Sequence, residues 1–557
     1  MPSNREISSI LKTLSELMEL HGKTSFKTKS YASAAFQIGR LDDEVENLAR
    51  PQLEKIINKS IIPKIMELKE TGTLEMLEEL IELTPPGIFE MMRIKGLGGK
   101  KLGLIWKKAG IENLEALLEA CKNNELAQLN GFGEKTQQNI LKSIEYYNAN
   151  TNKFHLATVA RDGEKIVESL KRVFKSDQVS LCGELRRQCN VVSGIEILCT
   201  LPSKKVIAKK SELPHLIIKS SSANEIKGHT INEIPFTIYV TSEEEYFYTL
   251  FKMTGNEEHV NKIISRVKDS YSVYESEEQI YKAAEVSYVL PEMRENLAEW
   301  DFIKKEKANN LVTDGDILGV VHNHTTWSDG IDTLKNFADA CIRKGFQYAV
   351  ISDHSKNAHY AGGLTEEQII RQQEEIDALN KKIAPFKIFK SIECDILIDG
   401  NLDYNNDFLK RFDLVIISVH QSLKMDEEKA TKRLLRAIEN PYTTILGHMT
   451  GRKLLVRSGF PVDYKKIIDA CAANNVIIEI NANPYRLDMD YSHIPYALKK
   501  GVMISVNPDA HSIGEIDNIH WGITSARKGG LTKDMTWNAM TLKEIEKWLK
   551  NRRRRQT

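Results

Sequence analysis

Imidazole and carboxylate side chains recur after short apolar runs in the C-terminal part of this 557-residue chain. The residues are His322, His324, Asp329, His354, Glu393, His420, His448, Asp509 and His511. A single His-x-His pair is more often a satisfied or exposed pair of histidines than a metal site. Nine such residues in similar positions predict a multinuclear metal site. Imidazole and carboxylate suit Zn, Mn and Fe, and carboxylates can bridge neighbouring ions.

The segments that must position these residues alternate between strand-type and helix-type hydrophobic patterns. Runs typical of β-strands lie at 317–321, 348–351, 414–419 and 444–446. Stretches with helical periodicity lie between them, at 332–343, 366–383 and 464–474. The repeat of strand, polar residue and helix predicts a β/α barrel, a fold that carries its chemistry at the carboxyl ends of its strands.

This series resembles the PHP (polymerase and histidinol phosphatase) domain, a distorted β/α barrel of metal-dependent phosphoesterases. The resemblance covers residues 315–557 and includes Gly451-Arg452 and the segment 479–484. It implies that all nine residues bind up to three ions, expected to be Mn²⁺ and/or Zn²⁺. Glu393, His511 and Arg452 are the candidate catalytic residues.

The same resemblance implies how the ligands divide among the ions. Glu393 is expected to bridge two of them, with four further residues completing that pair: His322, His324, Asp329 and Asp509. A further ion is assigned to His354, His420 and His448, and His511 is placed near the nucleophile. Arg452 is expected either to contact a phosphate oxygen or to pair with a local carboxylate.

Composition bounds the class of protein. Lys plus Arg and Asp plus Glu are both 77, so the net charge argues neither for nor against nucleic acid. Seven scattered cysteines without a C-x-x-C motif and a polar first segment predict a reduced, cytoplasmic protein without a signal peptide or zinc finger. No apolar run approaches the roughly 20 residues that span a bilayer, so no membrane partner is expected. We expect several domains and a monomer.

The first domain is expected at residues 1–86. Helical patterns at 4–20, from residue 30, and at 53–68 precede a break at Pro85-Pro86. Their order resembles the small lyase-type domain that opens family X DNA polymerases. Lys64 aligns with the Schiff-base lysine of that family and is the candidate lyase residue; the alternative is an ordinary solvated lysine.

Two glycine turns follow within residues 87–150, each between helical patterns and each followed by a lysine. Glycines in such turns leave backbone N–H groups free at a helix start, where they bind a phosphate without reading a base. The sequence predicts tandem helix-hairpin-helix DNA binding, with plain helix-helix turns as the alternative. The candidate residues are Gly96, Gly98, Lys100, Gly131, Gly133 and Lys135.

Residues 151–296 resemble the palm and thumb of family X polymerases, an α/β nucleotidyltransferase fold. The family's catalytic residues are missing here: Glu184 replaces the serine of its phosphate turn, and its three metal-binding aspartates align with Gly194, Glu196 and Thr237. One carboxylate cannot hold two Mg²⁺ ions, so we expect little or no templated synthesis. The palm is predicted either to hold DNA through Arg186 and Arg187 or to act as a spacer, and 297–314 is expected to be a linker.

The predicted fold class is therefore multi-domain: an all-α front end, an α/β palm and a C-terminal distorted β/α barrel. The resemblance implies a Mn- or Zn-dependent 3′–5′ exonuclease or 3′-end-processing nuclease of DNA repair, acting also at abasic sites. Its partner would be gapped or 3′-recessed DNA, held by backbone contacts. Three alternatives remain open: an active gap-filling polymerase with a PHP exonuclease, a small-molecule PHP phosphatase, and a non-catalytic DNA-binding scaffold.

Overall fold

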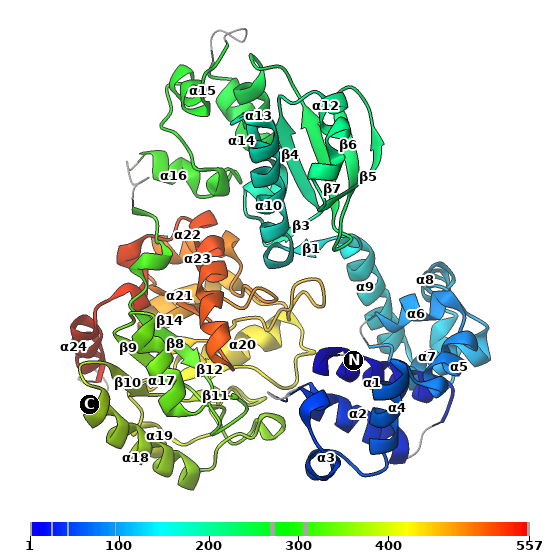
Figure 1. The fold of residues 1–557 in the computed structure, drawn as a ribbon. Helices are drawn as coiled ribbons and strands as arrows, with labels where there is room; N and C mark the ends of the chain where they lie inside the picture. Colours follow the sequence, from blue (N-terminus) through cyan, green and yellow to red (C-terminus); the bar gives the residue numbers. More distant parts are fainter. Residues whose placement is uncertain are drawn as a thin grey trace. The chain divides into compact units, whose positions relative to one another are not determined.

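The computed structural model describes residues 3–23, 26–39, 41, 44–94, 96–267, 273–304 and 310–553. The chain divides into two units, residues 1–151 and 152–557, and each is described by itself (Figure 1). In the described part of the chain, no helix has both the length and the apolarity needed to cross a membrane.

The first unit is built from helices alone in its described residues. Its long elements are α1 (Asn4–Leu20), α2 (Phe26–Ile38), α3 (Arg50–Ile56), α4 (Ile62–Thr71), α5 (Glu75–Glu82), α6 (Pro86–Met92), α7 (Gly99–Ala109), α8 (Leu114–Lys122) and α9 (Glu134–Asn150). Short 3-10 turns, η1 (Val45–Asn47) and η2 (Leu126–Gln128), lie between them. All-helical architecture was predicted for this region and is confirmed.

The pattern of α1 shows why the helices form. Ser3 and Glu6 make a reciprocal capping box at its start. Ile7, Leu11 and Leu14 then recur on one face and are fully buried. Each such side chain contributes about 1.5–3 kcal/mol when it is removed from water.

Two expectations for the first unit need correction. The stretch 53–68 is divided between α3 and α4, and Pro63 sits in the first turn of α4, where its missing N–H costs no hydrogen bond. The next difference is the helix expected from residue 30, which already begins at Phe26.

The second unit begins with the palm. Its five-stranded sheet has the order β2-β4-β7-β6-β5, in which β4 and β7 are parallel and the other pairs antiparallel. A small antiparallel pair, β1 with β3, lies beside it. The bounds are β1 (Phe154–His155), α10 (Leu156–Phe174), β2 (Val179–Leu181), α11 (Gly183–Arg186), β3 (Val191–Val192), β4 (Ile195–Cys199), α12 (Ser203–Ala208), η3 (Lys210–Glu212), β5 (Leu216–Ser221), β6 (Glu225–Thr230) and β7 (Pro235–Val240).

A helical subdomain follows the palm sheet and is held by buried polar groups. Arg294 is fully buried and donates to Glu277 and to the carbonyl of Val289. The expected linker at 297–314 instead starts with a helix, whose Trp300 packs on this subdomain. Its elements are α13 (Tyr246–Thr254), α14 (Glu257–Ile264), α15 (Glu277–Ala283), η4 (Pro291–Met293) and α16 (Glu299–Lys304).

The rest of the unit is a parallel β/α domain. Its strands are β8 (Gly319–Asn323), β9 (Tyr348–Ile351), β10 (Lys387–Lys390), β11 (Glu393–Asp395), β12 (Ile416–Ser418), β13 (Ile445–Leu446), β14 (Ile477–Asn481) and β15 (Ile504–Asn507). Its helices are α17 (Leu334–Arg343), α18 (Glu366–Ile383), α19 (Asn406–Leu409), α20 (Glu427–Ile438), α21 (Tyr464–Asn474), α22 (Ile494–Lys499), α23 (Ile519–Lys528) and α24 (Leu542–Arg553). Short 3-10 turns are η6 (Asp314–Asp316), η7 (His359–Ala361), η8 (Tyr491–His493), η9 (Ile513–Asn518), η10 (Lys533–Met535) and η11 (Trp537–Ala539).

These strands close into a barrel. Strand β10 pairs with β9 while its continuation β11 pairs with β12, so one bent strand joins the sheet β10-β9-β8 to the sheet β11-β12-β13-β14-β15. At the other edge the N–H of His324 donates to the carbonyl of Ala510 (2.8 Å), which joins β8 to the segment after β15. The distorted β/α barrel predicted from the sequence is confirmed.

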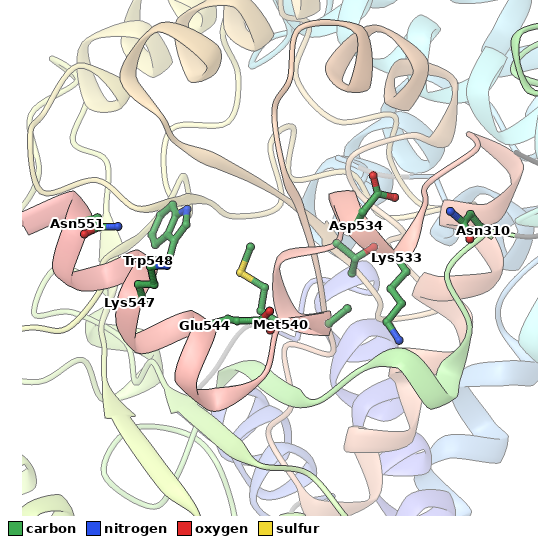
Figure 2. Close-up of a pocket in the computed structure, with 10 residues that line it drawn as sticks. Asn310, Lys533, Asp534, Met540, Glu544, Lys547, Trp548 and Asn551 are labelled. Carbon is green, nitrogen blue, oxygen red and sulfur yellow. The ribbon is translucent and has the colours of Figure 1, made fainter. Parts of the chain in front are cut away.

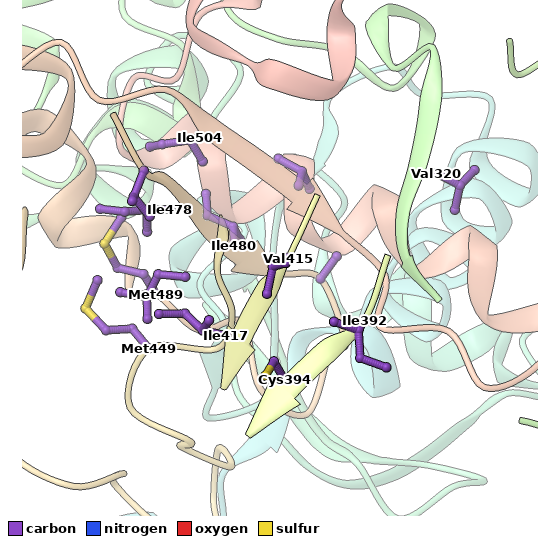
Figure 3. Packing of buried hydrophobic residues seen from close by; sticks show 14 of the residues in the cluster. Val320, Ile392, Cys394, Val415, Ile417, Met449, Ile478, Ile480, Met489 and Ile504 are labelled. Atoms are coloured by element: carbon purple, nitrogen blue, oxygen red, sulfur yellow. The ribbon is translucent and has the colours of Figure 1, made fainter. Parts of the chain in front are cut away.

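Alternating strand residues build two apolar layers. Val320 and Ile417 belong to the layer between the strands and the surrounding helices, part of which Figure 3 shows. Their neighbours Val321 and Ile416 belong to a second cluster with the fully buried Trp537 of η11. Both faces of the parallel strands are therefore buried, and most polar side chains lie at the strand ends, with Glu479 inside β14 as an exception.

Buried ionic contacts join the palm to the barrel within the second unit. The ammonium of Lys528 on α23 is fully buried and lies 2.7 Å from both the carboxylate of Glu295 and the carbonyl of Arg187. Arg527 donates to Glu292 at 2.7 Å and 3.0 Å. These bonds fix the helical subdomain on the outer helices of the barrel.

Candidate metal centre

The structure brings all nine predicted metal ligands to one end of the barrel. His354, His420 and His448 each lie just beyond the end of a strand, and Glu393 begins β11. His322 and Asp509 adopt left-handed backbone conformations (φ 65° and 53°), and the pairing of β8 with β9 shifts register beside His322. Such conformations are costly for non-glycine residues and cluster at functional sites.

Glu393 is the centre of the cluster. Its Oε1 lies 2.9 Å from His448 Nε2 and 3.0 Å from His420 Nε2. On the other side, its Oε2 lies 2.9 Å from His354 Nδ1 and 3.7 Å from His324 Nε2. The two oxygens of one carboxylate therefore face two separate groups of imidazoles.

A second focus lies at Asp329. One oxygen of this carboxylate is 3.4 Å from His511 Nε2, 3.5 Å from His354 Nε2 and 3.9 Å from His324 Nδ1. The ring of His511 donates through Nδ1 to the carbonyl of Asp509. His511 therefore turns its Nε2 toward the cluster, and its side chain, 33% exposed, is among the more accessible of the nine.

Three groups of side chains have ligand atoms close enough to share one ion, which is compatible with metal binding. They are His324, Asp329, His354 and His511; His322, His324 and Asp509; and His354, Glu393 and His420. The expected division differs in two respects. His354 lies with Asp329 and His511 as well as with His420, and His448 belongs to none of the three groups, although its Nε2 lies 2.9 Å from Glu393 Oε1.

Several buried ligand atoms make no hydrogen bond within the described residues. They are His322 Nε2, His324 Nδ1, His354 Nδ1, His448 Nδ1 and Glu393 Oε2. A buried polar group without a partner costs about 1–3 kcal/mol, so five in one cluster need a common explanation. Divalent ions suit this donor set of imidazoles and carboxylates.

Outer carboxylates orient the histidines. Glu479 Oε2 lies 2.6 Å from His322 Nδ1, and Asp395 Oδ1 lies 2.5 Å from His420 Nδ1. With Nδ1 donating to these acceptors, each ring presents its Nε2 lone pair to the cluster. The tautomer that a metal requires is thus fixed by residues outside the ligand set.

The charges of the cluster oppose the effect of burial. Burial alone would lower the pKa of His420, but Glu393 and Asp395 outweigh it and raise the pKa to about 10. By contrast, burial and the neighbouring His511 and His354 lower the pKa of His324 to about 3. Burial would raise the pKa of Glu393, yet the surrounding imidazoles hold it well below its ordinary value. The cluster thus keeps carboxylates ionised in a buried place.

Sequence reasoning missed the outer residues of the site. Glu479 and Asp395 were not predicted as site residues, and neither was Asp353, which accepts from Thr325 and Ser328. The signal available was a charged residue within or directly after an apolar strand, as in Ile478-Glu479-Ile480. A carboxylate is rarely buried there unless it has partners.

Arg452 does not occupy the position that was expected. Its guanidinium donates to Asp490 (2.5 Å) and to the backbone carbonyls of Arg486 and Leu487. Because its donors are engaged and the side chain is 13% exposed, Arg452 braces the loop after β13 and is not available to a phosphate. The alternative of a local carboxylate partner is the one observed.

A separate pocket of about 540 Å³ lies elsewhere on the barrel (Figure 2). Its lining includes Lys533, Met540 and Trp548. The same segment bonds the first residues of strands, since the carbonyl of Met540 accepts from the Tyr348 hydroxyl. The pocket is thus at the amino ends of the strands, away from the metal ligands, where barrels carry stability and not chemistry.

The palm places its altered catalytic positions together. The register of β4 and β7 pairs Glu196 with Thr237, which supports the looser part of the sequence alignment. A Cβ atom on Gly194 would lie 2.7 Å from the carbonyl oxygen of Pro235. Glu184 accepts a bond from the N–H of Ser193 (2.7 Å). Of the three aligned positions only Glu196 carries a carboxylate, and Gly194 has no room for one.

The expectation that Arg186 and Arg187 bind DNA also needs correction. Arg186 donates to both oxygens of Glu277, and Arg187 donates to Glu295 at 2.9 Å. Both also bond Thr254, through its hydroxyl and its carbonyl. Their charges are neutralised inside the protein, so they hold the helical subdomain against the palm.

The two glycine turns of the first unit share one geometry. Gly96 and Gly131 adopt φ of 91° and 95°, and the residues after them, Leu97 and Phe132, are buried. Space around the turn glycines is open, as a phosphate would need. The lysines that follow are exposed: Lys100 and Lys135.

Lys64 has the environment of a structural lysine. Its ammonium lies 2.5 Å from the Glu67 carboxylate, three residues along α4. This hydrogen bond raises the pKa of Lys64, with burial opposing it. A Schiff-base lysine needs a lowered pKa, so the geometry favours the ion-paired alternative.

Comparisons with known proteins cover the whole chain. Residues 2–74 match the helix-hairpin-helix domain, and residues 88–145 match the SAM-like helix-hairpin-helix tandem. The DNA polymerase/3′-5′ exonuclease PolX of Bacillus subtilis (strain 168) is 33% identical over 98% of this chain and 99% of its own length. A probable phosphatase of Thermoanaerobacter sp. (strain X514) is 29% identical over 42% of this chain and 95% of its own length. Another, from Caldanaerobacter subterraneus subsp. tengcongensis, is 26% identical over the same share of the chain and 91% of its own length.

Proposed function

This chain belongs to the PolX family of DNA polymerase/3′-5′ exonucleases, and on that premise we propose that its barrel is the working site of a 3′–5′ exonuclease. The single observation that carries the proposal is the buried cluster of imidazoles and carboxylates around Glu393, in which several buried nitrogen and oxygen atoms lack hydrogen-bond partners among the described residues. Its reaction is the hydrolysis of a phosphodiester at a DNA 3′ end, including blocked or abasic ends, in DNA repair.

The residues present fit two or three divalent ions, Mn²⁺ and/or Zn²⁺. When bound, such ions make water a nucleophile near neutral pH and stabilise charge on the phosphate. Glu393 is placed to bridge, because its two oxygens face different imidazole groups. Glu479 and Asp395 hold His322 and His420 in the orientation that keeps their Nε2 atoms directed inward.

The substrate phosphate would approach the cluster from its more accessible edge. The side chain of His511 is 33% exposed and that of Asp329 is 13% exposed, whereas that of Glu393 is 1% exposed. A phosphate approaching from solvent would meet His511 and Asp329 first. His511 can then hold or pass on a proton at Nε2, since its Nδ1 is engaged with the backbone.

We propose that the palm of this member adds no nucleotides. Two hard cations need several oxygen ligands, and Glu196 is the one carboxylate left among the three aligned positions. Burial raises the pKa of Glu196, and the charge of Glu184 adds to this effect. A triphosphate would meet this pair of acidic side chains where positive charge is required.

DNA is the proposed partner because the front end supplies contacts that a small ester does not need. The exposed lysines after the two glycine turns suit phosphates of gapped or 3′-recessed DNA. The proposed domains are 1–86, 87–150, 151–296 and 315–557, and we propose a monomer acting in the cytoplasm.

A primer assay tests the function and its competitors together. Full-length protein with Mn²⁺ receives a 5′-labelled primer on a gapped template, with and without dNTPs, beside the double variant His322→Ala, Glu393→Ala. Shortening in both conditions, lost in the variant and kept in the exposed control Glu546→Gln, is the expected result. Primer lengthening would refute the silent palm. Hydrolysis of p-nitrophenyl phosphate without any shortening would favour the phosphatase function of the partial relatives.

A further inference from the structure

A small hairpin on the metal-bearing face of the barrel carries unusual charge. In the loop after β13, Lys453 and Arg457 form an antiparallel bridge, with N–O distances of 3.0 Å and 2.7 Å. The N–H of Leu454 donates to the carbonyl of Tyr485 (2.8 Å), in the loop after β14. Arg486 follows Tyr485 directly. We call Lys453, Arg457 and Arg486 the cationic rim.

Within the described parts of the chain, Asp509 and Asp488 act on Lys453 and Arg457 through space, but neither carboxylate pairs directly with the rim. No ion pair involving its three members is found there, although their neighbour Arg452 is paired with Asp490. The one side-chain bond of the group runs from Arg457 Nε to the carbonyl of Gly451. Burial lowers the pKa of Lys453, and the charges of Arg486 and Arg457 lower it further. Three like charges held together without a direct ion pair are typical of an anion site.

The rim borders the metal centre. Its hairpin begins five residues after the ligand His448, and Thr450 in that stretch bonds Asp488 from the next loop. Asn481, at the end of β14, donates to the ligand Asp509 at 2.9 Å. Asp509 also raises the pKa of Lys453, against burial and the charges of Arg486 and Arg457 that lower it, in keeping with this connection between the two loops and the ligands.

An exposed aromatic ring completes the surface. Tyr485 is 52% exposed, and the ring of the palm residue His155 stands edge-on to it, with 4.7 Å between the ring centroids. The ring of His155 also contacts the carbonyl of Leu454 at 3.1 Å. The palm thus fixes the hairpin and one edge of Tyr485 while more than half of the tyrosine remains open to solvent.

We propose that the cationic rim and Tyr485 form a binding subsite for the last nucleotides of a single DNA strand, which enters the metal centre at its 3′ end. The inference rests on the proposed exonuclease function and names the residues that select its substrate. Cations track the phosphates while the tyrosine stacks on a base, the combination used for sequence-tolerant single-strand binding. His155 acts as a positioning residue that links the palm to the nuclease.

The first test reads contact without requiring cleavage. An oligonucleotide with a 3′-terminal 5-iododeoxyuridine and a terminal phosphorothioate linkage is irradiated with full-length protein and Mn²⁺, and crosslinked peptides are identified by mass spectrometry. We expect a crosslink at Tyr485 that unlabelled single strand competes away. It should be lost in the double variant Lys453→Ala, Arg486→Ala and kept in Lys432→Ala, a matched exposed lysine on α20. Crosslinks confined to residues 1–151 would overturn the inference.

The second test separates affinity from chemistry. Loss of one charged hydrogen bond raises KM by about 10-fold or more. Each single-strand phosphate contact contributes about 0.7 to the slope of log K against log salt. The triple rim variant should therefore lose about 2 from that slope. Tyr485→Ala should raise KM, and Tyr485→Phe should restore it because the ring remains. Unchanged KM and salt slope would refute the subsite while leaving the exonuclease intact, whereas a Tyr485 crosslink without any cleavage would refute the exonuclease and leave the subsite.

Discussion

Replacing Glu479 by glutamine tests whether the outer carboxylates determine metal affinity. Glu479 accepts from His322 Nδ1 (2.6 Å), Asn507 Nδ2 (2.7 Å), the N–H of His448 (3.0 Å) and Asn481 Nδ2 (3.2 Å). Four donors thus converge on two oxygens. Glu479→Gln keeps the shape but turns one acceptor into a donor, so at least one pair of donors is left facing an NH₂ group.

Loss of such an outer partner weakens metal binding by about 10–100-fold, which equals about 1.4–2.7 kcal/mol. The Kd for Mn²⁺ from isothermal titration, and the Mn²⁺ concentration that gives half of the maximal nuclease rate, should both rise by this factor. The rate at saturating metal should change less, since the nine ligands remain. Glu546→Gln on α24, whose partner Lys387 is part of an exposed pair, is the matched control. An unchanged Mn²⁺ affinity in Glu479→Gln would refute the role of the outer carboxylates.

Three further predictions concern stability. Lys528→Met removes the buried ammonium between Glu295 and the carbonyl of Arg187 and should lower the free energy of unfolding by about 3 kcal/mol, seen as a lower thermal midpoint. Lys533→Met, in an exposed pair, should lower that free energy by less than about 1 kcal/mol. Equal midpoints of the two variants would contradict the buried link. Chelation should remove the stability that bound metal adds to the wild type, about 2.7 kcal/mol when the ion is at 100 times its Kd, and should therefore lower the thermal midpoint. The midpoint of Glu393→Gln should fall less. Equal shifts in both proteins would count against Glu393 as a ligand. Burial would raise the pKa of Glu277, but Arg186 and Arg294 lower it below its ordinary 4.5. The stabilising effect of Glu277 is therefore complete above pH 4.5 and is lost as the pH falls through the folded-state pKa. Wild type and Glu277→Gln should converge in stability on acidification, and a constant difference down to about pH 3 would contradict this.

The barrel and its ligands could be predicted because local sequence carries them. Most of the predicted ligands follow or begin a short apolar run, and strand ends of a parallel barrel converge wherever the chain folds into one, so the gathering of these side chains could be predicted. His322 and Asp509 show the limit of this reasoning: histidine and aspartate adopt the left-handed backbone more often than most residues, but the residue type does not predict it at a given position. Glu479 was missed because it interrupts an apolar strand, where sequence alone gives no sign of its four donors.

The arginines show what sequence reasoning could not decide. Arg186 and Arg187 were candidate DNA contacts, with a spacer role for the palm as the alternative, and Arg452 was expected either to contact a phosphate or to pair with a local carboxylate. Their acidic partners lie far along the chain, with Glu277 91 residues from Arg186 and Glu295 108 residues from Arg187. Such pairs form only when the tertiary fold brings distant segments together. The rim that the structure offers in their place has no motif, since its three cations come from two separate loops.

The buried ammonium of Lys528 bears on how this chain could have changed over evolutionary time. Deleting the palm and its helical subdomain would remove the Glu295 and Arg187 partners of Lys528 and the Glu292 partner of Arg527, while the bond from Arg527 to the carbonyl of Val312 would remain. In a lineage that no longer needed nucleotide addition, loss of the palm would still lower the stability of the barrel. Mutations could erode the palm's catalytic positions freely, while its removal would destabilise the nuclease. If the palm adds no nucleotides, as proposed above, it would persist as an obligate brace for the nuclease.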